Sequence, residues 1–93
     1  MSDATARPLV SITYCQKCNF LPRAAWVAQE LLHTFGDALA GVTLVPGGGG
    51  QFDVAIDGEL LFANREQGRF PETRELREAV GRRLEGGWQS RHA

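Results

Sequence analysis

The chain has 93 residues, 43% of them hydrophobic, and its ten basic residues are balanced by eleven acidic ones. This length predicts one small domain, and the near-neutral charge gives no general attraction to nucleic acid or to an anionic membrane. No run approaches the roughly 20 apolar residues of a membrane span. The polar start of the chain does not resemble a secretory signal, so we expect a cytoplasmic protein.

The first third of the chain predicts a strand followed by a helix. Residues 1–7 are small and polar, and we interpret them as a disordered tail. Residues 8–14 alternate and are rich in β-branched side chains, which is typical of a strand. Helical spacing of apolar residues then indicates a helix over about 20–35, with Asn19 as its N-cap and Pro22 in its first turn.

Three strands are expected in the middle of the chain. Residues 41–46 form the first, and four glycines follow at 47–50. Residues 51–56 alternate cleanly and form the second. Asp-Gly at 57–58 is a strong signal for a tight hairpin turn, which makes 59–63 the antiparallel return strand.

The last third of the chain predicts a loop and a second helix. Residues 64–70 are interpreted as a loop, and Pro71 opens the helix. Gly86 ends the helix, so we place the folded domain at 8–85 and a C-terminal tail at 86–93.

This order, β-α-β-β-β-α, predicts an α/β fold. The helix between the first two strands makes them parallel, whereas the hairpin strands are antiparallel, so the four-stranded sheet is mixed. The hairpin has one apolar face, which carries Phe52, Val54, Ile56, Leu60 and Phe62. The opposite face of the sheet carries Ser11, Thr13, Thr43, Asp53 and Ala55. A sheet with one apolar face needs cover on that face only, so we expect a two-layer sandwich with both helices on one face.

The only two cysteines, Cys15 and Cys18, follow the carboxyl end of the first strand, where ligands bind in open α/β sheets. The parallel second strand ends at the same edge, so Gly48, Gly49 and Gly50 are expected beside the cysteines. The loop after the fourth strand should reach the same edge. The glycine run is either a flexible connection or a backbone that a substrate approaches closely, since glycine has no side chain.

Three interpretations of the Cys-x-x-Cys pair are open from the residues alone: a thiol redox centre, part of a zinc site, or two inert thiols. A helix N-terminus beside the pair stabilises a thiolate, with Lys17 as a nearby cation and Asn19 as the expected cap. Zinc needs four ligands, and only His33 and His92 could supply nitrogen. We therefore favour thiol–disulfide chemistry and expect no metal.

Three segments carry a family resemblance: "SITYCQKCNFLPRAAWVAQEL", "VPGGGGQFDVAIDGELLF" and "EQGRFPETREL", in this order. Together they resemble the selenoprotein W-like branch of the thioredoxin-like redox proteins, which includes selenoproteins T and H. The resemblance covers residues 8–84. It implies a thioredoxin-like fold and thiol redox activity, with glutathione as a co-substrate and no bound cofactor.

The resemblance also bears on which cysteine attacks. Analogy with thioredoxin favours Cys15, whereas selenocysteine, in the family members that have it, stands at the position of Cys18. Because Cys18 also lies closer to the expected helix N-terminus, we choose it as the nucleophile, with Cys15 as the resolving thiol. The cis-proline that thioredoxins place before the facing strand is replaced here by Gly50 and Gln51.

Three further residues are candidates for substrate contact. Arg65 and Arg69 either bind an anionic carboxylate or belong to a solvated loop, and Phe52 is either the floor of the site or part of the core. The expected partner is a thiol or disulfide, either glutathione or a protein; the oligomeric state is not predicted. Two functions follow: a thiol–disulfide oxidoreductase, or a non-enzymatic interaction module that oxidation of the pair switches.

Overall fold

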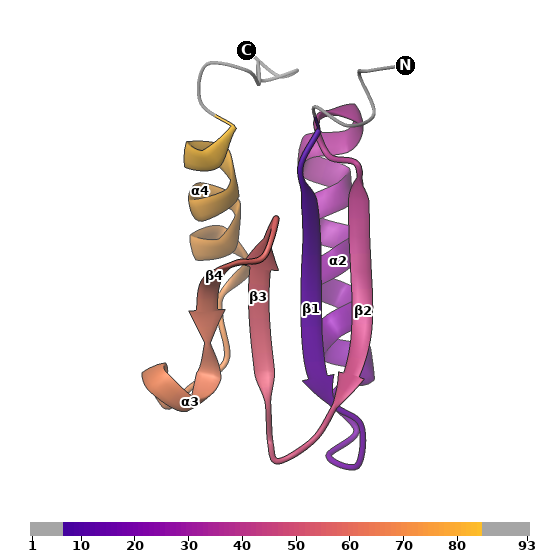
Figure 1. Cartoon of the computed structure of the whole chain (residues 1–93), viewed down its shortest axis with the longest axis vertical. Coiled ribbons are helices and arrows are strands. Elements are labelled where there is room, and N and C mark those ends of the chain that lie inside the picture. The colour runs from indigo at the N-terminus through magenta and orange to yellow at the C-terminus, as the bar shows by residue number, and fades with distance from the viewer. Residues whose placement is uncertain (1–6, 85–93) are drawn as a thin grey trace.

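The structure, a computed structural model, describes residues 7–84 (Figure 1). The predicted order of a strand, a helix, three strands and a helix is confirmed, with two short helical additions. The elements are β1 (Leu9–Cys15), α2 (Leu21–Phe35), the 3-10 turn η1 (Gly36–Ala38), β2 (Gly41–Gly47), β3 (Phe52–Ile56), β4 (Glu59–Ala63), α3 (Asn64–Gln67) and α4 (Thr73–Arg83). The expected tails, apart from Arg7, and the helix stop at Gly86 lie outside the described residues.

The four strands form one mixed sheet in the order β2-β1-β3-β4. β1 pairs with β2 in parallel and with β3 antiparallel, and β3 pairs antiparallel with β4. The turn between β3 and β4 has positive φ at both Asp57 and Gly58, as a type I′ turn requires. β1 is therefore an inner strand, and its last residue, Cys15, lies between Gly47 of β2 and Gln51, the residue that precedes β3.

Both helices cover the same face of the sheet, as expected (Figure 1). β1 and β3 send alternate side chains into one core, to which α2 and α4 add their apolar stripes. The members of the core from these four elements are Val10, Ile12, Tyr14, Ala24, Val27, Ala28, Leu31, Phe35, Phe52, Val54, Ile56, Leu76 and Val80. Arg77 and Glu30 form an ion pair at 3.6 Å that links the two helices at the surface.

The structure corrects the expectation that Leu60 faces the core. A register irregularity between Val54 and Ala55 shifts the pairing with β4, so that Ala55 lies opposite Leu60. Ala55 lies on the open face, and Leu60 is 48% exposed there. The reason is that one extra residue in a strand reverses the faces of the side chains beyond it.

The segment 64–70, which we expected to be a loop, begins with α3, a single helical turn closed by Gly68 in the left-handed conformation. The final helix begins at Thr73 rather than at Pro71. Glu72 is its N-cap, and Glu75 completes a capping box in which each side chain binds the backbone of the other residue. Across the part of the chain that the structure describes, no helix is long and apolar enough to cross a membrane.

Candidate functional site

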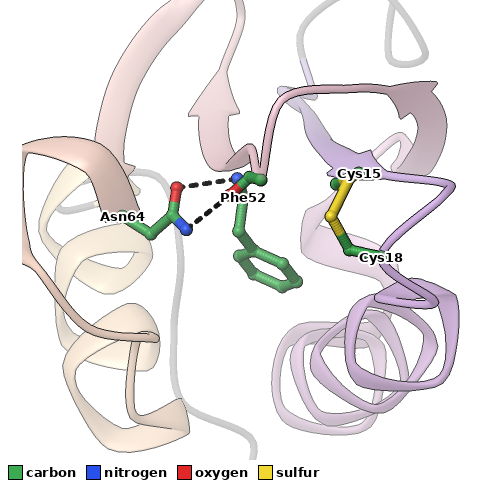
Figure 2. Close-up of a disulfide and its surroundings, with 5 residues drawn as sticks. Cys15, Cys18, Phe52 and Asn64 are labelled. Atoms are coloured by element: carbon green, nitrogen blue, oxygen red, sulfur yellow. Dashed lines mark hydrogen bonds between the residues drawn. A yellow bond between two sulfur atoms is a disulfide. The ribbon is translucent and has the colours of Figure 1, made fainter.

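A disulfide joins Cys15 and Cys18 at the carboxyl end of β1 (Figure 2). Cys15 is the last residue of the strand, and Cys18 lies in the turn that leads to α2. Their Cα atoms are 5.3 Å apart. The turn is closed by the Phe20 N–H, which donates to the Cys15 carbonyl at 3.3 Å, so the chain doubles back immediately after the strand. The two intervening residues thus bring the sulfurs together.

The two cysteines differ in accessibility. Cys15 is buried, with 2% of its surface exposed, whereas Cys18 is exposed. Burial follows from position, because Cys15 continues an inner strand and Cys18 stands on a surface turn. A reagent in solution can therefore reach the pair from the side of Cys18.

The helix next to the pair is capped differently from our expectation. α2 begins at Leu21, and Phe20, not Asn19, occupies the N-cap position, without a side-chain hydrogen bond to the helix. Asn19 instead adopts a positive φ of 61° inside the turn, a conformation that asparagine tolerates better than most residues. Cys18 still lies nearer than Cys15 to the helix N-terminus, where the free N–H groups favour negative charge.

Lys17 is the one basic residue between the two cysteines. Its side chain is exposed and makes no hydrogen bond or ion pair with the residues that the structure describes. The ammonium group is therefore available to an anion at this turn.

The loop that joins β2 to β3 reaches the disulfide, as we predicted from the parallel pairing of β1 and β2. The Gln16 N–H donates to the Gly47 carbonyl at 3.1 Å, and the Cys15 N–H donates to the Gln51 carbonyl at 2.8 Å. A further bond within the loop, from the Gln51 N–H to the Gly48 carbonyl at 3.2 Å, turns the chain back into β3. Both ends of the loop are thus fastened to the cysteine motif.

The glycines of this loop are not equivalent. A Cβ on Gly47 would lie 2.6 Å from the Gln51 side-chain oxygen and 2.9 Å from the Thr13 methyl group, so this position has no room for a side chain. Gly48, Gly49 and Gly50 face open space, and within residues 7–84 their N–H groups have no acceptor. These three residues leave free donors at the edge of the site.

Asn64 is a residue of the site that the sequence did not reveal. It is the first residue of α3, and its side-chain oxygen accepts a hydrogen bond from the Phe52 N–H at 2.9 Å. Its side-chain nitrogen donates to the Gly50 carbonyl at 2.8 Å (Figure 2). The chain after β4 is thereby fastened to the start of β3, which confirms that this segment reaches the same edge of the sheet. The only signal in the sequence is an asparagine directly after a strand.

An aromatic cluster lies beside the disulfide. Phe52 is fully buried, and its ring lies 6.5 Å from that of Phe20 and 5.5 Å from that of Phe70, both in edge-to-face geometry. The Arg23 guanidinium stacks over the Phe70 ring at 4.0 Å. Of the two interpretations of Phe52, the core position is the one that the structure shows.

The two candidate arginines have different surroundings. Arg69 forms a paired hydrogen bond with Glu75, at 2.6 and 3.1 Å, and stacks over Phe62 at 5.3 Å. These bonds raise the pKa of Arg69 and lower the pKa of Glu75, which also accepts the Glu72 N–H. Arg65 is exposed and has no ion pair or hydrogen bond to the described part of the chain. Arg65 is thus the arginine that remains available to a ligand.

No metal-binding cluster is present in the region from Arg7 to Leu84: no three residues among His, Cys, Asp and Glu are gathered there. His33 is exposed on α2, and His92 lies outside the described residues.

Comparison with known proteins identifies relatives over nearly the whole domain. A sequence model of the Rdx family matches residues 9–82. A crystal structure of a protein from Bordetella parapertussis covers 84% of this chain and 99% of its own, with 46% identity and a TM-score of 0.82. The crystal structure of a selenoprotein W-related protein from Vibrio cholerae covers 84% of this chain and 98% of its own, with 36% identity and a TM-score of 0.81.

Curated relatives include migration and invasion enhancer 1 from Mus musculus and from Bos taurus, each 32% identical over 79 residues. These residues are 83% of the present chain and 65% of either relative, so the chain spans about two thirds of their length. The comparisons agree with a thioredoxin-like α/β fold that carries a Cys-x-x-Cys pair.

Proposed function

The chain belongs to the Rdx family, and on that premise we propose that it is a thiol–disulfide oxidoreductase that reacts through Cys15 and Cys18. The proposal is carried by the asymmetry of the pair, in which a buried sulfur is bonded to one on an exposed residue. An exposed sulfur can meet a substrate, and a sheltered sulfur beside it can displace that substrate. Two successive thiol exchange steps need this arrangement.

In the reducing direction, the Cys18 thiolate attacks one sulfur of a substrate disulfide. The Cys18 sulfur forms a mixed disulfide with that half of the substrate, and the other half leaves as a thiolate. The Cys15 thiolate then attacks the Cys18 sulfur, which forms the Cys15–Cys18 disulfide and releases the first half as a second thiolate. The substrate gains two electrons and the protein loses two. Two molecules of glutathione return the protein to the dithiol and leave joined as oxidised glutathione.

Three observations support Cys18 as the nucleophile. It is the exposed member of the pair, and it lies nearer the N-terminus of α2. Lys17 directly precedes Cys18 in the chain, and its ammonium group makes no hydrogen bond or ion pair within residues 7–84. A positive helix end and a neighbouring cation both favour the thiolate over the thiol.

We further assign glutathione-linked disulfides as the substrate class. Glutathione is an anionic thiol, and the free N–H groups of Gly48–Gly50 together with Arg65 offer donors for its carboxylates. Arg69 contributes less than Arg65, because its guanidinium is already held by Glu75. Phe52 is buried, so it supports the site without touching the substrate.

The test is turnover of the mixed disulfide of glutathione and 2-mercaptoethanol, recycled by glutathione, glutathione reductase and NADPH. The wild-type protein is expected to exceed the uncatalysed rate, and Cys18→Ser is expected to abolish the excess. Background turnover by the wild type, or full turnover by Cys18→Ser, contradicts the proposal. Background turnover combined with partner binding that depends on oxidation would favour the interaction module instead.

A further inference from the structure

The side chain of Asn64 forms hydrogen bonds on both sides of one residue, Gln51, which directly precedes β3. It accepts from the Phe52 N–H at 2.9 Å and donates to the Gly50 carbonyl at 2.8 Å, one bond on either side of Gln51. An asparagine amide makes both bonds because it holds an acceptor and a donor in one plane. The backbone on both sides of Gln51 is thereby fixed to the start of α3.

Gln51 is also the backbone contact of the buried cysteine. Its carbonyl accepts the Cys15 N–H at 2.8 Å, and its own N–H is held by the Gly48 carbonyl at 3.2 Å. The place of Cys15 at the end of β1 therefore depends on a peptide that Asn64 holds from the other side. Figure 2 shows Asn64 and the disulfide on opposite sides of Phe52.

A second route connects the same residues through their rings. Phe52, whose N–H is bound by Asn64, packs its ring edge-to-face against Phe20. Phe20 is the N-cap of α2, and its N–H donates to the Cys15 carbonyl at 3.3 Å. Both backbone groups of Cys15 are thus bonded to residues whose positions Asn64 helps to set.

We propose that Asn64 is a positioning residue that holds Cys15 in place to close the disulfide with Cys18. In the closing step the Cys15 thiolate attacks the sulfur of Cys18 in a mixed disulfide, and the bound thiol leaves as a thiolate. Asn64 touches neither sulfur; it acts through the Gln51 carbonyl. The inference rests on the proposed function for its role in a cell, but the equilibrium of the Cys pair with a small thiol can be measured without any enzyme assay.

The equilibrium between dithiol and disulfide reports the effective concentration of Cys15 at Cys18. Without the two bonds from Asn64, the backbone at Gln51 is held less tightly, so Cys15 samples more positions. A smaller share of those positions allows the disulfide with Cys18 to form. We expect the loss of both hydrogen bonds to destabilise the disulfide relative to the dithiol by roughly three- to tenfold in the equilibrium constant. A tenfold change raises the reduction potential by about 30 mV.

The experiment compares wild type with Asn64→Ala, Asn64→Asp and the control Gln67→Ala. Ala removes both bonds, whereas Asp keeps the acceptor for the Phe52 N–H and places a second oxygen against the Gly50 carbonyl. Gln67 is exposed on the same turn of helix, and its side chain makes no hydrogen bond to the described residues. Each protein is equilibrated with reduced and oxidised dithiothreitol; ring closure of the reduced form supplies two electrons, and ring opening of the oxidised form accepts them. The fraction of disulfide is read by alkylation and mass spectrometry.

We expect both Asn64 variants to contain a smaller fraction of disulfide than wild type at the same ratio of reduced to oxidised dithiothreitol. Gln67→Ala should match wild type. A stopped-flow measurement should also show slower loss of a glutathione mixed disulfide on Cys18, with an unchanged rate of its formation. If the role of Asn64 is only structural, its loss destabilises both redox forms equally and leaves the reduction potential and the rate of disulfide closure unchanged. That result overturns the proposal.

Unfolding curves of the oxidised and reduced proteins separate the two cases even if Asn64→Ala is partly unfolded. A wild-type protein without turnover contradicts the proposed function and leaves this measurement valid.

Discussion

Arg69 donates two hydrogen bonds to Glu75, at 2.6 and 3.1 Å, and so ties the segment after α3 to the first turn of α4. The same carboxylate accepts the Glu72 N–H in the capping box, at 3.0 Å. These bonds lower the pKa of Glu75 from its ordinary value of 4.5, the largest cause being the bond from Arg69. One carboxylate therefore stabilises both the loop and the helix while it is ionised.

The first prediction is a dependence of stability on pH. A folded pKa below the unfolded one gives a stabilisation that is present above pH 4.5 and is lost as the pH falls through the lower folded value. Glu75→Gln removes the charge, so its thermal midpoint should lie below that of wild type at pH 7 and approach it at acid pH. Thermal unfolding by circular dichroism across pH 2–7 checks this, and a constant gap between the two curves would contradict it.

The second prediction concerns the order of attack. With Cys15→Ser the exposed Cys18 remains, and it should react with oxidised glutathione on the order of tenfold faster than the buried Cys15 that remains in Cys18→Ser. Mass spectrometry of the adducts at neutral pH gives both rates. Faster modification of Cys15 would assign the attack to that residue.

The third prediction separates two neighbouring glycines. Gly47→Ala forces the new methyl against Gln51 and Thr13 and disturbs the Gln51–Asp53 hydrogen bond, so it should cost about 1–3 kcal/mol of stability. Gly48→Ala is the matched control, because an added Cβ there meets nothing within 4 Å. Its stability should lie within about 0.5 kcal/mol of wild type. Chemical denaturation measures both, and equal costs would show that the contact at Gly47 is relaxed without penalty.

The fourth prediction tests the register of β4. Leu60 is 48% exposed on the open face, so Leu60→Ala should cost less than about 1 kcal/mol of unfolding free energy. Leu76 lies in α4 and is 1% exposed, so Leu76→Ala should lower the free energy of unfolding by about 2–5 kcal/mol. The comparison uses the same substitution at two leucines, and a large loss at Leu60 would place that side chain in the core.

The order of elements and the meeting of the loops could be predicted because they follow from periodicity and from the geometry of parallel strands. The alternation of 51–56 and the Asp57–Gly58 turn each act over a few residues, so a local pattern is enough to find them. The carboxyl ends of β1 and β2 must lie at one edge once a helix joins the two strands. These rules placed Cys15 beside the glycine loop without any knowledge of side-chain contacts.

The remaining features depend on contacts between distant residues. The bulge that exposes Leu60 follows from how β4 fits β3, and no local signal marks it. Asn64 gains its role only because Gly50 and Phe52 arrive beside it, 14 and 12 positions back in the chain. Asn19 is suited both to an N-cap and to a left-handed turn, and the closed turn after Cys15 selects the second.

The disulfide links positions only three apart, within one turn, and joins no two elements of the sheet or the helical layer. The core cluster beneath it is made of side chains from β1, β3, β4, α2 and α4 together with Leu39 and Leu84, and neither cysteine is a member of it. A crosslink over so short a loop removes little freedom from the unfolded chain. In the proposed reaction the disulfide can therefore form and open without joining or separating any two elements of the fold.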